Sequence, residues 1–194
     1  MHYFTKAEFI KSCNSMDSLP LNRLNEVVFV GKSNVGKSSL INSLVNQKRL
    51  AYTSSTPGMT RLLNYYLIED RFYFVDFPGY GYSKKKDLDY IFYSKFVDAY
   101  FDNNKYLKLI IFLLDSRHKP TEDDALFYKF IKENNFNYLI VMTKCDKLNM
   151  SMKSKITKNI NEVFKEKNTN YICTSINDLK SIESLKTKIE DAVR

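Results

Sequence analysis

The sequence contains little cysteine and histidine, and their positions do not match a metal or disulfide pattern. The three cysteines, Cys13, Cys145 and Cys173, are odd in number and have no paired spacing. We therefore expect a reducing, cytoplasmic environment and no zinc site. The two histidines, His2 and His118, are too isolated in the sequence to form a metal pair or a catalytic triad.

Long hydrophobic runs are absent as well. The longest run, residues 109–114, has the length of a strand, whereas a membrane-spanning helix needs about 20 residues. Residues 1–11 mix polar and aromatic side chains and include Glu8, which argues against a signal peptide. Hydrophobic residues still make up 44% of the 194 residues, so we expect one globular domain with a proper core.

The charge balance is basic, with 30 lysines and arginines against 22 aspartates and glutamates and a formal net charge of +8. Such a surface favours a polyanionic partner, because contacts with phosphates release counterions and speed encounter. The low content of glycine (5) and proline (4), together with abundant lysine and asparagine, is also what an AT-rich genome would produce. Charge alone leaves both interpretations open.

Short apolar runs alternate with stretches of helical period, which predicts an α/β fold with a mostly parallel sheet. We expect about six strands, one antiparallel edge and helices on both faces. The predicted strands lie near 27–30, 61–68, 72–75, 109–114, 138–142 and 171–173, and the helices near 37–45, 91–99, 125–131, 156–164 and 182–189. Residues 1–24 are expected to be a peripheral extension, and residues 25–194 the main domain.

A glycine-containing loop follows the first predicted strand and precedes a predicted amphipathic helix. Its residues are Gly31, Lys32, Ser33, Asn34, Val35, Gly36, Lys37 and Ser38. The glycines allow successive backbone N–H groups to point at phosphate, and the helix adds the positive end of its dipole. We expect Lys37 to reach the β- and γ-phosphate oxygens and the Ser38 hydroxyl to ligate Mg2+.

A second motif, Asp76, Phe77, Pro78 and Gly79, follows another predicted strand. The carboxylate of Asp76 would then lie near the phosphate loop, where it can hold Mg2+ through water. Gly79 can present its backbone N–H to the γ-phosphate. The alternative is an ordinary turn that contains Pro-Gly.

The third motif, Thr143, Lys144, Cys145 and Asp146, lies at the carboxyl end of a predicted strand, where ligands bind in such sheets. A carboxylate at Asp146 can accept hydrogen bonds from N1–H and the 2-amino group of guanine. Adenine has neither donor and would leave a desolvated carboxylate unpaired. The stem of Lys144 can cover the face of the ring. The motif therefore favours guanine over adenine.

Together, the segments GKSNVGKSSLIN, TPGMTRLLNYY, DFPGYGYS and TKCDK resemble the EngB family of bacterial ribosome-assembly GTPases. The likeness runs from about Glu26 to the C-terminus. It implies a Ras-like P-loop GTPase domain with a three-layer fold, binding of GTP and GDP, and slow Mg2+-dependent hydrolysis. It also implies a precursor of the large ribosomal subunit and its rRNA as partners, and a role in cell division and septation. We expect a monomer.

The resemblance also assigns two further segments. Gly58, Met59, Thr60, Arg61 and Leu62 match the first switch, in which Thr60 would ligate Mg2+ and act in catalysis; Thr56 is a competing threonine. Cys173, Thr174 and Ser175 match the segment whose backbone supports the guanine O6. The residues that follow, 176–178, depart from the usual lysine- and glycine-containing continuation.

Tyr80 stands where many GTPases hold a water-positioning glutamine. The expected catalytic residues are Lys37, Thr60 and Gly79, and without such a glutamine they would need another source of positive charge. Asn34 resembles the potassium ligand of cation-dependent GTPases, and a K+ ion there would stabilise transition-state charge; alternatively, Asn34 only braces the loop.

The sequence leaves two interpretations of residues 84–86 open. These three lysines of the second switch loop would contact RNA or form a solvated charge run.

Two other functions also remain possible alternatives to a GTPase switch. One is a nucleotide-gated binding module with negligible hydrolysis, and the other is an ATP-dependent enzyme.

Overall fold

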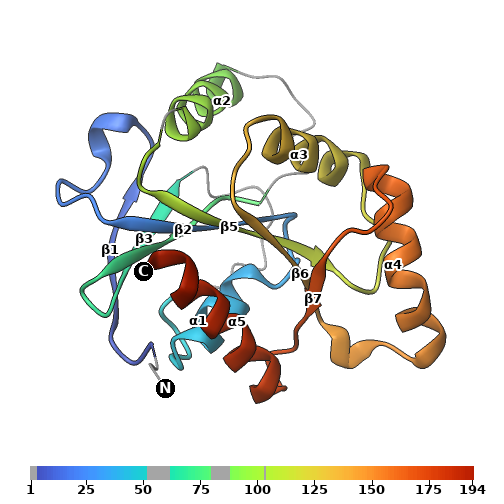
Figure 1. Cartoon of the computed structure of the whole chain (residues 1–194). Helices are drawn as coiled ribbons and strands as arrows, with labels where there is room; N and C mark the ends of the chain where they lie inside the picture. The colour runs from blue at the N-terminus through green and yellow to red at the C-terminus, as the bar shows by residue number, and fades with distance from the viewer. Residues whose placement is uncertain (1–3, 52–61, 80–87, 103) are drawn as a thin grey trace.

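The computed structural model describes residues 4–51, 62–79, 88–102 and 104–194, with only the backbone of residues 88–94. In this part of the chain, seven strands form one sheet in the order β1-β3-β4-β2-β5-β6-β7 (Figure 1). The strands are β1 (Ala7–Cys13), β2 (Asn25–Gly31), β3 (Leu63–Ile68), β4 (Phe72–Asp76), β5 (Leu107–Asp115), β6 (Tyr138–Thr143) and β7 (Tyr171–Cys173). Strands β4, β2, β5, β6 and β7 are parallel, whereas β3 is antiparallel to both β4 and β1.

Helices cover both faces of the sheet and make three layers (Figure 1). Helices α1 (Lys37–Leu44) and α5 (Leu179–Val193) pack on one face. Helices α2 (Leu88–Phe101), α3 (Glu122–Glu133) and α4 (Met150–Phe164) pack on the other. The predicted α/β three-layer fold with an antiparallel edge is therefore confirmed.

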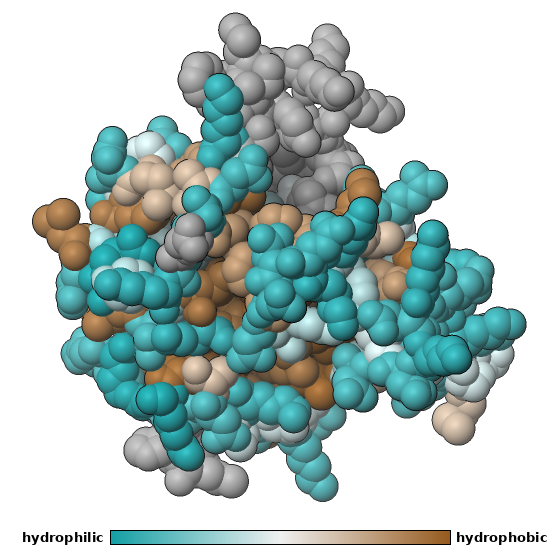
Figure 2. Space-filling model, turned by 45° about the horizontal axis from the view of Figure 1, so that its top comes forward, coloured by the Kyte–Doolittle hydropathy of each residue, from teal (hydrophilic) through white to brown (hydrophobic). Residues whose placement is uncertain are grey.

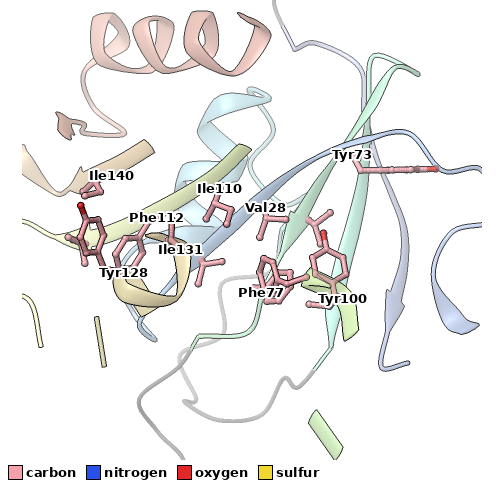
Figure 3. Packing of buried hydrophobic residues seen from close by; sticks show 14 of the residues in the cluster. Val28, Tyr73, Phe77, Tyr100, Ile110, Phe112, Tyr128, Ile131 and Ile140 are labelled. Atoms are coloured by element: carbon pink, nitrogen blue, oxygen red, sulfur yellow. The ribbon is translucent and has the colours of Figure 1, made fainter. Parts of the chain in front are cut away.

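The central strands divide their side chains between two cores because successive residues of a strand point to opposite faces. Val28 of β2 and Ile110 of β5 belong to the core under α2, α3 and α4, whereas Phe29 and Ile111 belong to the core under α1 and α5. Figure 3 shows Val28, Ile110, Phe112 and Ile140 beside the rings of Phe77, Tyr100 and Tyr128. This two-sided burial explains why these strands read as continuous apolar runs.

The first 24 residues contribute more than the expected periphery, because β1 lies at the edge of the sheet. Residues 7–13 pair antiparallel with β3, from Ala7 opposite Ile68 to Cys13 opposite Leu63, with a bulge between Phe9 and Lys11. The sheet therefore has seven strands where about six were expected. The boundary between residues 24 and 25 stays a prediction.

Helix α3 begins at a capping box and packs the apolar side chains of its predicted segment, 125–131, against the core, with one exception. The Thr121 side chain accepts from the Asp124 N–H, and the Asp124 carboxylate accepts from the Thr121 N–H at 2.7 Å. The exception is Leu126, which is 67% exposed. It is two residues from both Asp124 and Tyr128, so it lies about 200° around the helix from each of these two buried residues.

Figure 2 shows hydrophilic side chains over most of one face, with hydrophobic atoms visible between them. Among the described residues, no helix combines the length and the hydrophobicity that crossing a bilayer would require.

Candidate functional site

The three motifs meet at the carboxyl edge of the parallel strands. Gly31 ends β2, Asp76 ends β4, Thr143 ends β6 and Cys173 ends β7. Segments more than a hundred residues apart in the sequence therefore lie side by side, at the edge where ligands bind in doubly wound sheets.

The phosphate loop joins β2 to α1 and has no room for larger residues at its first glycine. A Cβ on Gly31 would lie 2.8 Å from the carbonyl oxygen of Leu113. Gly36 has a φ of +104° and directly precedes α1, and Asn34 has a φ of 65°. These positive angles turn the loop sharply, so that it ends at the N-terminus of α1, the positive end of the helix dipole.

Lys37 and Asp76 form an ion pair at the centre of the site. The ammonium group and the carboxylate are in contact, and their side chains are only 12% and 8% exposed. Ser38 follows Lys37 in the first turn of α1. The Ser38 hydroxyl and the Asp76 carboxylate are the hard oxygen ligands that Mg2+ prefers, so the residues present fit this ion.

Gly79 lies directly against the phosphate loop. A Cβ at this position would be 2.7 Å from the backbone nitrogen of Ser33, so the contact requires glycine. The Ser33 hydroxyl lies 3.5 Å from the Gly79 carbonyl oxygen. On the other side of this segment, the Phe77 ring packs against Tyr100 and Phe101 of α2, at centroid distances of 5.0 and 5.2 Å. The second motif therefore links the phosphate loop to α2.

Thr143 connects the base-recognition motif to the phosphate loop. Its hydroxyl group donates to the Val35 carbonyl oxygen at 2.6 Å, and it lies 3.2 Å from the Leu114 carbonyl oxygen. The Lys144 ammonium donates to the Asn34 carbonyl oxygen at 2.7 Å and to the Asp115 carboxylate at 2.9 Å. These two hydrogen bonds hold the Lys144 ammonium group in place, and Lys144 also lines the pocket that contains Asp146.

Asp115 is a site residue that the sequence analysis missed. Its carboxylate accepts from the side chain of Arg117 at 2.7 and 2.9 Å as well as from Lys144. Burial alone would raise the pKa of Asp115, but the hydrogen bonds from Arg117 and Lys144 outweigh it and lower the pKa to about 2. Its place at the end of β5, on the same edge as the motifs, was the signal available in the sequence.

A pocket of about 140 Å³ lies between Lys144 and the loop after β7. Asp146 lines it, and its carboxylate lies 3.4 Å from the Asn177 side-chain amide. A hydrogen bond from Ser175 is the main cause that lowers the pKa of Asp146. An ionised carboxylate only accepts hydrogen bonds, which is the property that recognition of guanine requires.

The loop after β7 is held against the base-recognition motif by hydrogen bonds. The Thr174 N–H donates to the Met142 carbonyl oxygen at 2.8 Å, and the Ser175 N–H donates to the Ser181 hydroxyl at 3.2 Å. Within the described chain, the N–H of Ile176 has no such partner, and Ile176 lines the pocket. Ile176 is therefore a further candidate donor for a guanine O6, and the role of the predicted segment, Cys173 to Ser175, stays a prediction.

Two thiols lie behind the base pocket. The Cys145 N–H donates to the Thr174 carbonyl oxygen at 3.1 Å, which brings Cys145 beside Cys173. A hydrogen bond from the Cys173 thiol lowers the pKa of Cys145 to about 7, and the same interaction raises the pKa of Cys173. Both cysteines are unpaired thiols.

Some predicted residues lie outside the described part of the chain: Thr56, Gly58, Met59, Thr60, Arg61, Tyr80 and the lysines at 84–86. Leu62 is described and is half-buried. The phosphate-loop residues Lys32 and Ser33 are half-buried, and Val35 is buried. Pro78 is half-buried beside Gly79.

The phosphate loop, the adjoining carboxylate and a base pocket with an ionised aspartate define a guanine-nucleotide-binding protein of the P-loop class. The family model described as "50S ribosome-binding GTPase" matches residues 26–144. A probable GTP-binding protein EngB of Clostridium kluyveri is 46% identical over 93% of both chains. Another, of Clostridium beijerinckii, is 47% identical over 82% of this chain and 81% of its own. The chain belongs to the EngB family of GTPases.

Solved structures agree with this assignment. A crystal structure of a probable GTP-binding protein EngB has a TM-score of 0.67 and covers 87% of this chain and 98% of its own; at 22% identity, it shows the shared fold. The Era protein of Aquifex aeolicus, bound to GDP and aluminium fluoride, has a TM-score of 0.65 at 27% identity. It is matched over 89% of this chain and 58% of Era.

Proposed function

We propose that this protein is a GTP-dependent switch that binds GTP with Mg2+, hydrolyses it slowly and acts in assembly of the large ribosomal subunit. The observation that carries the proposal is the contact of Gly79 with Ser33, beside the ion pair of Lys37 and Asp76. A γ-phosphate bound at Ser33 would therefore act directly on the segment that leads to α2. Such a mechanical link is what a switch requires.

In this mechanism, the residues of the chain bind and orient the nucleotide. Lys37 would exchange its contact with Asp76 for the β- and γ-phosphate oxygens. Ser38 and Asp76, the latter through water, would hold Mg2+ together with Thr60; the ion supplies charge neutralisation across the phosphates. Gly79 would donate its N–H to the γ-phosphate. Asp146 would select guanine, with Lys144 covering the ring.

We further propose that K+ supplies catalytic charge near Asn34, because Tyr80 cannot orient water as a glutamine does. The Asn34 side chain is exposed, and among the described residues it has no hydrogen-bond partner. Its backbone carbonyl, which accepts from Lys144, already braces the loop. Asn34→Gly is the appropriate variant because glycine accepts the φ of 65°. Equal hydrolysis rates in matched Na+ and K+ buffers, for both proteins, would exclude the cation role.

For the partner, we propose a precursor of the large ribosomal subunit, contacted through its rRNA. The family description names the 50S ribosome, the net charge is +8, and a similar fold, Era, has been solved with nucleotides of 16S ribosomal RNA. We also propose a cytoplasmic monomer whose loss impairs cell division and septation. The test is depletion followed by sedimentation: the GTP-bound form should sediment with the accumulating precursor, and the GDP-bound form should not.

The second candidate is a GTP-gated binding module with negligible hydrolysis, which the tyrosine at position 80 favours. Single-turnover GTP cleavage, with and without ribosomal particles, separates the two functions.

The ATP-dependent alternative is tested by comparing the affinity for GTP with the affinity for ATP. If ATP binds as well as GTP, or if Asp146→Asn leaves the preference unchanged, the proposed base recognition is wrong.

A further inference from the structure

A second pocket lies behind the base-recognition motif, between the segment after β5 and helix α4. Its volume is about 150 Å³, close to the 140 Å³ of the pocket that we assign to guanine. Met142 lines this second pocket, whereas the next residue of β6, Thr143, lines the first. The two pockets therefore lie on opposite faces of the same strand.

The walls of the second pocket combine apolar and basic groups. Met142 and Met152 contribute apolar surface, and Arg117, Lys119 and Lys155 contribute positive charge. Among the residues that line it, none is acidic. Asp115 and Glu162 pair with Arg117 and Lys119 from outside the pocket, whereas Lys155 makes no ion pair within the described chain. The pocket therefore favours a ligand that has both an apolar part and a negative charge.

A buried hydroxyl group at this pocket lacks a hydrogen-bond partner. Ser116 is 6% exposed, and its Oγ makes no hydrogen bond of normal geometry within the described chain. It lies near enough to the Cys145 thiol to contribute to lowering its pKa, but this contact does not satisfy its geometry. A buried polar atom without a partner is unfavourable, so this hydroxyl would gain from a polar ligand if its side chain rotated towards the pocket.

We propose that this pocket binds one nucleotide of single-stranded RNA. The base would lie against the methionines and the phosphate would meet Lys155 and Arg117. The Ser116 hydroxyl, which is covered in this structure, would hydrogen-bond to the edge of the base after a rotation of its side chain. A free phosphate would leave the apolar wall unused, and an apolar ligand would leave the cations unused. Lys153 and Lys158 on the same helix extend the positive charge beyond the pocket, which fits a strand rather than an isolated nucleotide.

The first test measures RNA affinity by fluorescence anisotropy, with a labelled 12-nucleotide single-stranded RNA and the full chain bound to GDP. Lys155→Glu changes a residue of the pocket, and Lys158→Glu makes the same charge change outside it. We expect Lys155→Glu to weaken binding about fivefold or more beyond Lys158→Glu. Equal losses in the two variants would show only non-specific charge attraction and would overturn the proposal.

The second test asks whether the base is recognised as well as the phosphate. Uridine monophosphate cannot use the guanine pocket, so we expect it to compete for the RNA site better than inorganic phosphate at equal ionic strength. Equal competition would reduce the pocket to an anion site and refute the proposal. A photocrosslink from a 4-thiouridine in the RNA should map to residues 116–120 or 142–160, the two segments that line the pocket; a crosslink elsewhere would contradict the proposal.

Both tests include a control for folding. The thermal midpoint and the GDP affinity should be unchanged in Lys155→Glu, because Lys155 is exposed and lies outside the nucleotide site. A second variant, Asn159→Trp, fills the pocket without a change of charge and should also weaken RNA binding. Neither test needs ribosomes or GTP hydrolysis. RNA binding at this pocket can therefore be refuted while the proposed GTP switch stands, and the switch can be refuted while RNA binding stands.

Discussion

Replacing Thr143 by valine would remove a single hydroxyl group and keep the shape of the side chain. That hydroxyl is buried, and it donates to the Val35 carbonyl oxygen at 2.6 Å. Within the described chain, the Val35 carbonyl has no other hydrogen-bond donor. The substitution would therefore leave a carbonyl of the phosphate loop without a partner, at the point where that loop meets the base-recognition motif.

An unsatisfied buried acceptor costs about 1–3 kcal/mol. For a domain of this size, that corresponds to a fall in the thermal midpoint of about 2–12 °C. Because Val35 belongs to the loop that both GTP and GDP use, we expect Thr143→Val to weaken the binding of the two nucleotides equally. The loss should be about three- to tenfold, which corresponds to roughly 0.7–1.4 kcal/mol, near the lower end of the cost of the unsatisfied acceptor. Calorimetric titration with each nucleotide and a thermal scan measure both effects.

Two matched variants test the reasoning. Thr143→Ser keeps the hydroxyl and should bind nucleotide nearly as well as the unmodified protein. Thr174→Val also removes a buried hydroxyl, but its acceptor, the Met142 carbonyl, still receives the Thr174 N–H at 2.8 Å, so the loss should be smaller. If Thr143→Ser loses as much affinity as Thr143→Val, keeping the hydroxyl group does not preserve binding, and the hydrogen bond is not the cause of the loss.

Three further predictions concern neighbouring groups. Gly79→Ala should lower the affinity for GTP more than that for GDP, because its Cβ would lie 2.7 Å from the Ser33 nitrogen; equal losses in titrations of the two nucleotides would contradict this. The pKa of Asp115 is depressed to about 2, so its ion pairs should stabilise the fold fully above pH 4 and lose this effect between pH 4 and pH 2. In acid unfolding, the free energy of unfolding should fall by on the order of 1–2 kcal/mol over this range, and Asp115→Asn should abolish this step. The pKa of Cys145 is about 7, so iodoacetamide should label this thiol faster as pH rises through 7. GDP should slow the labelling, and Cys173→Ser should shift the dependence of the labelling rate on pH to higher pH.

The sequence predicted the strands and helices that have strong hydrophobic patterns. β5 and β6 are buried on both faces, so their apolar runs were visible without the structure. β1 was missed for the opposite reason. It is an edge strand with a bulge between Phe9 and Lys11, and most of its side chains are exposed or only half-buried, so its residues show no regular alternation. Edge strands of this kind carry too little burial to be recognised from periodicity alone.

The candidate site divides in a similar way. Lys37, Asp76 and Asp146 occur in short segments with fixed spacing, and such local patterns can be read from a sequence. Asp115 stands at the end of a strand on the same edge, but its contacts with Lys144 and Arg117 become visible only in the structure. The candidate role of Ile176 depends on which hydrogen bonds its neighbours have already made. The Ser175 N–H is bound to Ser181, six residues further along in α5, whereas the next N–H, that of Ile176, has no partner among the described residues. A motif thus identifies the segment that binds a base, but the folded chain decides which of its atoms remain available.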